Sequence, residues 1–363
     1  MINNYNYKAK KVVNLRVFDF NKIRNKEMNL TKREDVLKLS GLVVAKDYKT
    51  SINIINVWLN ENPFDHNAMS NFKGNKNPDK KKKYSGSPQD CYNKLLPVLE
   101  AMESLDPKSK LEKLFDGKTR INNINLFSDG NAKLRFLNYS TMPKVNCGGA
   151  GSCLTFCYSM KALRQPNVIV KWLATTILEG SAEGFSIIEK AFAYNIKRPT
   201  YKKELLENGN IAFRLYNDGD FQSLEKMVQW FKILKKFPMV KSYAYSKSLH
   251  IFKELIDIYG AEKIPSNFKL NLSSGIHPLF KGLKKTLANY DFVRGEFIGI
   301  DLGKKVKPTE LTKENKIELR AKARAMGFKK SFVCGGICQS CTSKGHACGM
   351  SRLKDVAIIT PIH

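Results

Sequence analysis

From residue 132 onward, short apolar runs alternate with amphipathic stretches along the chain. The runs have the length and the β-branched and aromatic content of buried strands. They lie at 133–139, 211–216, 240–245, 268–272 and 297–300. Apolar residues recur every three or four positions at 160–179, 224–234 and 251–258, as they do on helices. This order predicts an α/β fold with a parallel sheet and crossover helices, arranged as a complete or partial TIM-like βα barrel.

The N-terminal third has a different pattern. Segments 12–18 and 51–58 alternate apolar and polar residues, which predicts strands, and 71–86 has the glycine, proline and lysine content of an exposed loop. We therefore expect three parts. They are a basic N-terminal α+β elaboration over residues 1–125, a βα barrel-like domain over 126–330 and a cysteine-rich metal-binding segment over 331–363.

Charge adds a partner to this picture. The chain has 62 Lys and Arg residues against 33 Asp and Glu, a formal net charge of +29. Such an excess predicts a nucleic-acid partner bound through its phosphates, and the run Lys80–Lys83 would be a natural contact arm. The alternative is a codon bias that enriches lysine, but such bias also enriches Glu and would not unbalance the signs.

The N-terminus has no apolar segment typical of a signal peptide, and no apolar run reaches the length of a membrane span. We expect a cytoplasmic protein without a membrane partner. Eight cysteines in such a chain favour metal binding over disulfides, because the cytosol keeps thiols reduced. Cys91 stands alone among leucines and is predicted to be a buried apolar residue.

The first cysteine group has the spacing C-x5-C-x3-C at Cys147, Cys153 and Cys157. Three thiolates leave a tetrahedral site one ligand short. This suits a zinc ion with an open position, or a [4Fe-4S] cluster whose fourth iron binds a small molecule. The alternative is a structural zinc completed by a His or Cys from elsewhere.

The second group has the spacing C-x3-C-x2-C-x6-C at Cys334, Cys338, Cys341 and Cys348. Four thiolates form a closed site, which indicates structural zinc or an auxiliary [4Fe-4S] cluster. His346 could replace one cysteine, although an ordinary loop position is the favoured interpretation.

Polar residues follow each predicted strand, and in parallel α/β folds such strand ends converge on one ligand-binding edge. The candidates are Asn217, Asp218, Asp220, Lys247, Ser273 and Ser274. Lys247 could meet a carboxylate or phosphate, and the serines could bind ligand hydroxyls. Plainer interpretations are that one aspartate caps the helix beginning near Ser223, that Lys247 is a surface lysine and that the serines only turn the chain.

Phe156 directly before Cys157, and the position of this loop after the first barrel strand, resemble the cluster loop of radical S-adenosylmethionine (SAM) enzymes. The usual spacing there is C-x3-C-x2-C, so cleavage of SAM does not follow from the resemblance. Segments 214–221, 243–248 and 271–274 are similar to the phage "gene 88 protein" family, over roughly residues 130–350.

The resemblance implies that Cys147, Cys153 and Cys157 ligate three irons while SAM binds the fourth. The implied cofactor-binding residues are Phe156, Tyr158, Asn217, Asp220, Ser273 and Ser274. The implied catalytic residues are Asp218, Asp220 and Lys247. If the chain is encoded by a phage, it would act in the host cytoplasm.

Three functions remain open. The first is a radical-SAM-like iron–sulfur enzyme acting on nucleic acid or a nucleotide. The second is a zinc-containing barrel transglycosylase that exchanges a base in DNA, with Asp218 or Asp220 as nucleophile or base. The third is a metal-stabilised DNA-binding accessory protein without catalytic activity.

Overall fold

The computed structural model describes residues 28–63, 87–130, 136–336, 347–349, 353–354 and 356–362. The predicted strand at 12–18, the predicted loop at 71–86, Cys338, Cys341 and His346 lie outside the described residues. The chain forms two compact units. One contains residues 1–126 and 159–194, and the other contains residues 127–158 and 195–363.

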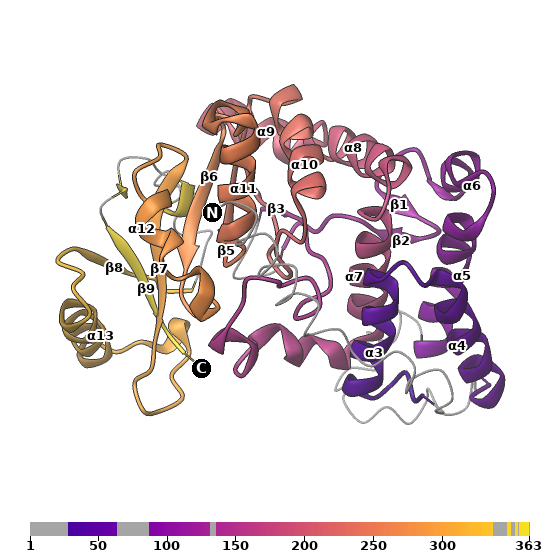
Figure 1. Cartoon of the computed structure of the whole chain (residues 1–363), viewed down its shortest axis with the longest axis horizontal. Coiled ribbons are helices and arrows are strands. Elements are labelled where there is room, and N and C mark those ends of the chain that lie inside the picture. Colours follow the sequence, from indigo (N-terminus) through magenta and orange to yellow (C-terminus); the bar gives the residue numbers. More distant parts are fainter. Residues whose placement is uncertain are drawn as a thin grey trace. The chain divides into compact units, whose positions relative to one another are not determined.

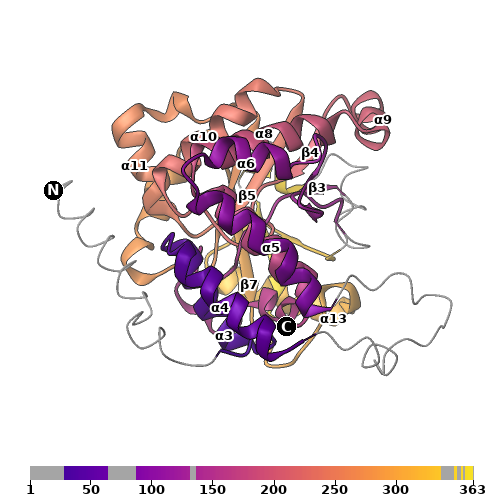
Figure 2. The same ribbon diagram turned by 90° about the vertical axis from the view of Figure 1, so that its right-hand side faces the viewer.

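The first unit is mainly helical, and neighbouring helices α3, α4 and α5 pack side by side (Figure 2). Its helices are α3 (Arg33–Val44), α4 (Tyr48–Glu61), α5 (Pro88–Glu103), α6 (Pro107–Leu114), α7 (Pro166–Leu178) and most of α8 (Ala182–Ile196). A small antiparallel pair, β1 (Arg120–Ile121) and β2 (Ile124–Asn125), accompanies them. Cys91 is buried in α5, as predicted.

The predicted strand at 51–58 is wrong, because this segment lies inside α4. Asp47 caps the helix by accepting a hydrogen bond from the Thr50 N–H at 3.2 Å. The buried residues Ser51, Ile55 and Trp58 are spaced four and three positions apart, which places them on one helical face. Asparagines between these positions imitate the alternation of a strand.

The second unit is built on a parallel sheet with the strand order β3-β4-β5-β6-β7-β9-β8, seven strands in all (Figure 1). The strands are β3 (Leu137–Asn138), β4 (Ile211–Arg214), β5 (Val240–Ser246), β6 (Phe268–Ser273), β7 (Val293–Ile300), β8 (Ser331–Val333) and β9 (Ala357–Pro361). The predicted α/β class with a parallel sheet is confirmed. The predicted strands at 211–216, 240–245, 268–272 and 297–300 correspond to β4, β5, β6 and the end of β7.

Helices cover one face of this sheet. The helices α10 (Leu224–Lys236) and α11 (Leu249–Tyr259) bring Phe231 and Phe252 against Phe268, with ring centroids 5.1 and 6.2 Å away. Further along, α13 (Lys313–Ala325) packs on β7 and β9. The predicted helices at 224–234 and 251–258 are therefore confirmed. The predicted helix at 160–179 begins later, as α7, after a 3-10 turn over Tyr158–Arg164.

The other face of the sheet is more polar. Arg214, Tyr243, Tyr245 and Asn271 share it, because each is in register with the next on a neighbouring strand or lies two residues further along the same strand. Arg294 of β7 is fully buried. Its guanidinium donates to Asn271 Oδ1 at 2.7 Å and to the carbonyl oxygens of Val356 at 2.7 Å and Glu296 at 2.8 Å. Amide and carbonyl oxygens thus satisfy the buried cation.

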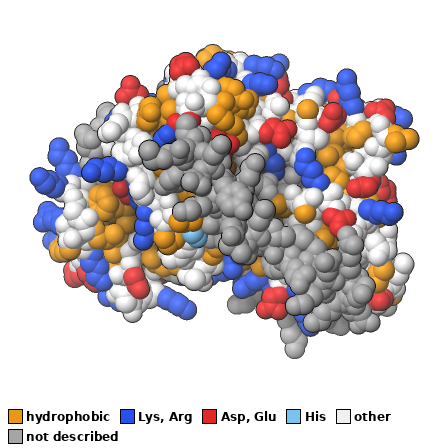
Figure 3. All heavy atoms as spheres, in the orientation of Figure 1, with side chains coloured by type: hydrophobic (Ala, Val, Ile, Leu, Met, Phe, Trp, Pro, Cys, Tyr) orange, Lys and Arg blue, Asp and Glu red, His pale blue; other side chains and the backbone are white. Residues whose placement is uncertain are grey.

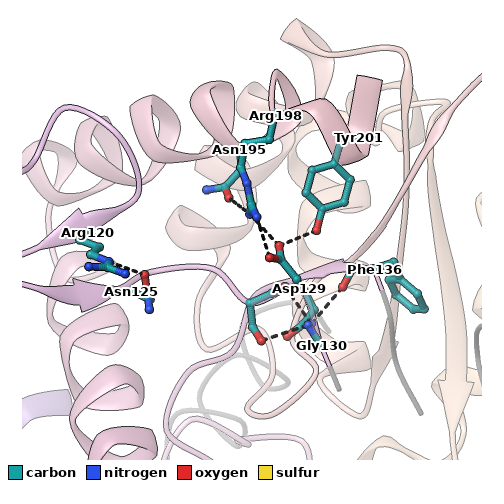
Figure 4. A network of polar contacts seen from close by, with 10 residues as sticks. Arg120, Asn125, Asp129, Gly130, Phe136, Asn195, Arg198 and Tyr201 are labelled. Carbon is teal, nitrogen blue, oxygen red and sulfur yellow. Dashed lines mark hydrogen bonds and ion pairs between the residues drawn. The ribbon is translucent and has the colours of Figure 1, made fainter. Parts of the chain in front are cut away.

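An ion pair joins the segment before β3 to helix α9 (Pro199–Asn208) (Figure 4). Both terminal nitrogens of Arg198 donate to the two Asp129 oxygens at 2.8 Å, and the Tyr201 hydroxyl donates to Asp129 at 2.7 Å. This bidentate geometry fixes the direction in which the chain enters the sheet. None of the helices in the described part of the chain is long and apolar enough to cross a membrane.

Candidate functional site at the carboxyl ends of the strands

The first cysteine loop follows β3 and begins by extending alongside the end of β4. The Tyr139 N–H donates to Arg214 O at 3.1 Å, the Asn217 N–H to Tyr139 O at 2.8 Å and the Thr141 N–H to Asp218 O at 3.0 Å. Because β3 and β4 are parallel, both chains leave the sheet at the same edge. The loop therefore begins at the predicted ligand-binding edge.

Two glycines seat the loop on the next strand ends. A Cβ on Gly149 would overlap the Lys247 carbonyl, and a Cβ on Gly151 would lie 2.6 Å from Ile276 O. The Gly151 N–H donates to Gly275 O at 2.7 Å, and the His277 N–H donates to Gly149 O at 2.9 Å. Glycine is needed here because the backbones approach too closely for a side chain. The loop thus lies directly on the carboxyl ends of β5 and β6.

The three cysteines of this loop are partly buried. Cys147 lies near Asp220, Lys247 and Cys157, and burial, followed by the Asp220 charge, raises the pKa of its thiol. The Cys153 N–H donates to Gly275 O at 3.4 Å. No three His, Cys, Asp or Glu side chains of the described residues converge closely enough to bind one metal ion. The metal-binding role of the loop stays a prediction.

Asp220 connects the ends of β4 and β5. Its Oδ1 accepts hydrogen bonds from Ser246 Oγ at 2.6 Å and Phe221 N at 2.8 Å, and its Oδ2 accepts one from Lys247 N at 2.8 Å. Only 4% of the residue is exposed, and this burial raises the pKa of the carboxyl despite the hydrogen bonds. Asp220 thus acts structurally, by positioning the backbone of Lys247.

The interpretation of Asp218 or Asp220 as a helix cap is wrong. Ser223 is the N-cap of α10, and its hydroxyl accepts from Lys226 N at 3.3 Å. Asp218 instead accepts hydrogen bonds from Asn217 Nδ2 at 2.9 Å and Ser140 Oγ at 3.2 Å. Its carboxylate is therefore held at the site edge rather than at the helix.

The remaining predicted residues divide between the site and the sheet. Lys247 Nζ donates to Ser273 Oγ at 2.9 Å, which places both at the ends of β5 and β6. The half-exposed Tyr158 donates its hydroxyl to Asn217 O at 3.0 Å, while Phe156 is 42% exposed. Ser274 Oγ accepts from Gly299 N at 3.0 Å and so ties β6 to β7.

Some residues of this site have no signal in the sequence. Ser246 holds Asp220, and Thr141 and Ser248 carry buried hydroxyls without a hydrogen-bond partner among the described residues. Ser248 also lies against Gly149, where a Cβ would contact its backbone at 2.6 Å. These are ordinary polar residues next to strand ends, and only their neighbours in space give them a role.

The sequence matches the family model described as Gene product 88 over residues 111–349. The chain belongs to the Gene product 88 family. The match contains all three cysteines of the first loop and the four cysteines of the C-terminal group. No curated protein and no solved structure matches the chain. The predicted resemblance to the gene 88 proteins is confirmed.

In this family member, the C-terminal cysteine group is anchored to the polar face of the sheet. The Tyr245 hydroxyl donates to Cys348 Sγ at 2.6 Å, and Asn271 Nδ2 donates to Cys348 O at 2.9 Å. Arg294 in turn holds Asn271, and the Arg214 guanidinium lies 4.6 Å above the Tyr245 ring. The Cys334 N–H pairs with Ile359 O at 2.8 Å. Both described cysteines of this group are therefore part of the sheet region.

Proposed function

We propose that this Gene product 88 family member is an iron–sulfur enzyme that acts on nucleic acid or a nucleotide, with its reactive cluster on Cys147, Cys153 and Cys157. The observation that carries the proposal is the seating of this loop. Gly149 and Gly151 bring three thiols onto the carboxyl ends of parallel strands, beside Lys247 and Ser273. Successive strands β3 to β7 lie in chain order, which fits a complete or partial TIM-like barrel.

The donor set fits a cluster better than a single ion. Three thiolates are one ligand short of a tetrahedral set, and no three metal-binding side chains of the described residues meet around one point. A four-iron cluster is wider than one ion, so its ligands lie further apart. When bound, such a cluster supplies one-electron chemistry, and its open iron could bind a small molecule such as SAM.

The surrounding residues would orient the reactants. The Lys247 ammonium, held by Ser273, is placed to bind a carboxylate or phosphate. Asp218 is the candidate partner for an ammonium group, and Tyr158 offers an exposed ring beside it. The net charge of +29 supports a substrate that carries phosphates.

Base exchange in DNA is less well supported. That reaction needs an aspartate free to attack or to accept a proton. Asp220 is buried with three hydrogen bonds, and Asp218 accepts two. The zinc centre and the non-enzymatic DNA-binding role are outcomes of the same test.

The test is anaerobic purification followed by iron, sulfide and zinc analysis and visible spectroscopy. We expect brown protein, and we expect the triple variant Cys147→Ala/Cys153→Ala/Cys157→Ala to lose about four irons per chain. Cys91→Ala, which removes a thiol in α5, is the matched control and should keep full iron. The double variant Cys334→Ala/Cys348→Ala reports the C-terminal group separately.

Stoichiometric zinc without iron in the unmodified protein, or full iron in the triple variant, would overturn the proposal. Reduced protein is then incubated with SAM. Release of 5′-deoxyadenosine supports radical chemistry, whereas intact SAM with a loaded cluster removes that part.

A further inference from the structure

Helix α13 carries a stripe of basic side chains on its exposed side. Lys313, Lys316, Arg320 and Arg324 are all exposed, and they follow one another at intervals of three, four and four residues. This spacing places them on one side of the helix, over about 16 Å along its axis. Figure 3 shows basic side chains gathered at the end of the molecule where Figure 1 places α13.

The opposite side of α13 is fixed to the sheet. Leu319 and Ala323 are buried in a cluster with Ile298, Ile300 and Ile359. Thr312 caps the helix in a capping box with Asn315, which is also buried. The rigid docking of the helix therefore holds the basic stripe toward solvent.

Acidic neighbours do not neutralise the stripe. Glu318 pairs with Lys322 at 3.3 Å, and Glu310 pairs with Lys307 at 2.7 Å. Within the described part of the chain, no ion pair involves any of the four stripe residues. Four exposed lysines flank the helix and add to the same charge. They are Lys304, Lys305, Lys329 and Lys330.

Helix stability does not account for the position of two of these charges. Lys313 is the first residue of α13, and Lys316 lies one turn later. The helix dipole is positive at this end, so each cation there costs roughly 0.3–1 kcal/mol in an exposed helix. Arg324, in the last turn, is favourable to the dipole. An anionic ligand explains the N-terminal lysines, which the helix alone disfavours.

We propose that this stripe is a binding surface for the phosphate backbone of nucleic acid, which names the partner surface of the function proposed above and rests on it. A membrane is a poorer match because the apolar side of α13 faces the protein. On the exposed side, Ile317 is the large apolar residue of the stripe. The Cys334 segment follows directly after β8, so the bound strand would pass beside the C-terminal cysteine group.

The test compares two four-residue variants of equal charge change. One replaces the stripe, as Lys313→Gln/Lys316→Gln/Arg320→Gln/Arg324→Gln. The other replaces exposed lysines of α9 and α10, as Lys202→Gln/Lys203→Gln/Lys232→Gln/Lys235→Gln. Binding of labelled duplex DNA and of single-stranded RNA is measured by fluorescence anisotropy at several salt concentrations, and iron is measured on the same samples.

We expect the stripe variant to bind at least about tenfold more weakly, with a slope of log K against log salt that is shallower by up to about 3.6 for duplex DNA. The control variant should keep the slope of the unmodified protein. The preferred nucleic acid identifies which source of phosphate the surface takes. Equal losses in both variants, or binding to anionic phosphatidylserine vesicles in place of nucleic acid, would overturn the surface. Iron retained alongside that result leaves the cluster proposal standing.

Discussion

The two cysteine groups are held in different ways. The first loop is fastened by backbone contacts, where Gly149 and Gly151 lie against the ends of β5 and β6. The C-terminal group is fastened through side chains, where Tyr245 and Asn271 hold the thiol and the carbonyl of Cys348. The first arrangement depends on the absence of side chains, and the second depends on their presence.

Both arrangements use the same two strands. Tyr245 and Asn271 lie two residues before Lys247 and Ser273, which is about 7 Å along a strand. Two groups far apart in the sequence therefore meet neighbouring rows of β5 and β6. The comparison teaches that the sheet organises both candidate metal regions, and that they can be disrupted separately.

The largest effect is expected for Gly149→Ala. The new methyl group would overlap the Lys247 carbonyl, so the loop or the end of β5 must move. We expect a loss of about 3 kcal/mol in the free energy of unfolding, measured in urea. Gly282→Ala is the control, because no atom lies within 4 Å of its added Cβ, and it should change stability by less than about 0.5 kcal/mol. Equal stability of the two variants would contradict the close seating.

The second prediction concerns Asp220. Asp220→Ala leaves three buried donors without an acceptor and should cost about 3 kcal/mol, whereas Asp220→Asn keeps the two bonds to Oδ1 and should cost about half as much. The folded-state pKa of Asp220 is raised, so its contribution to stability is largest below the unfolded pKa of about 3.9 and falls as pH rises. Urea unfolding should therefore show the difference between Asp220→Asn and the unmodified protein narrowing from pH 4 to pH 7.

A pH effect of opposite sign is expected from His250, which stacks on Phe280 at 4.2 Å behind the segment that holds Gly149. Burial lowers its pKa to about 4, and its Nδ1 has no hydrogen-bond partner among the described residues. The neutral ring therefore contributes stability above the unfolded pKa of about 6.5, and this contribution is lost as pH falls toward 4.

His250→Phe keeps the stacking and removes the titration. Between pH 7 and pH 5, the unmodified protein should lose about 1–2 kcal/mol more unfolding free energy than this variant. Parallel curves for the two proteins would show that His250 titrates normally in the fold.

The smallest effect is expected on the side-chain-held group. Tyr245→Phe removes the hydroxyl that donates to Cys348 Sγ, at a cost of about 1 kcal/mol, and leaves the ring beneath Arg214. Alkylation of Cys348, followed by mass spectrometry, should become faster, while labelling of Cys147 stays unchanged. Tyr259→Phe, on the exposed part of α11, is the control. Faster labelling of both cysteines would mean that the two regions are not independent.

Local pattern predicted the central strands well. β4, β5 and β6 are short apolar runs between amphipathic helices, and both signals arise from residues close in sequence. The same reasoning failed at α4, where asparagines gave a false alternation. β8 and β9 were not predicted, because each is a few residues long and pairs with a strand distant in sequence.

The sequence by itself determined the grouping of the cysteines, the glycines between them and the polar residues after each strand. Only the tertiary structure decided what these residues touch. It placed Ser246 on Asp220, Lys247 on Ser273 and the buried Arg294 behind Asn271. The reason is physical. Periodicity and composition report how one segment meets solvent, whereas hydrogen bonds between strand ends depend on which strands pair and in which register.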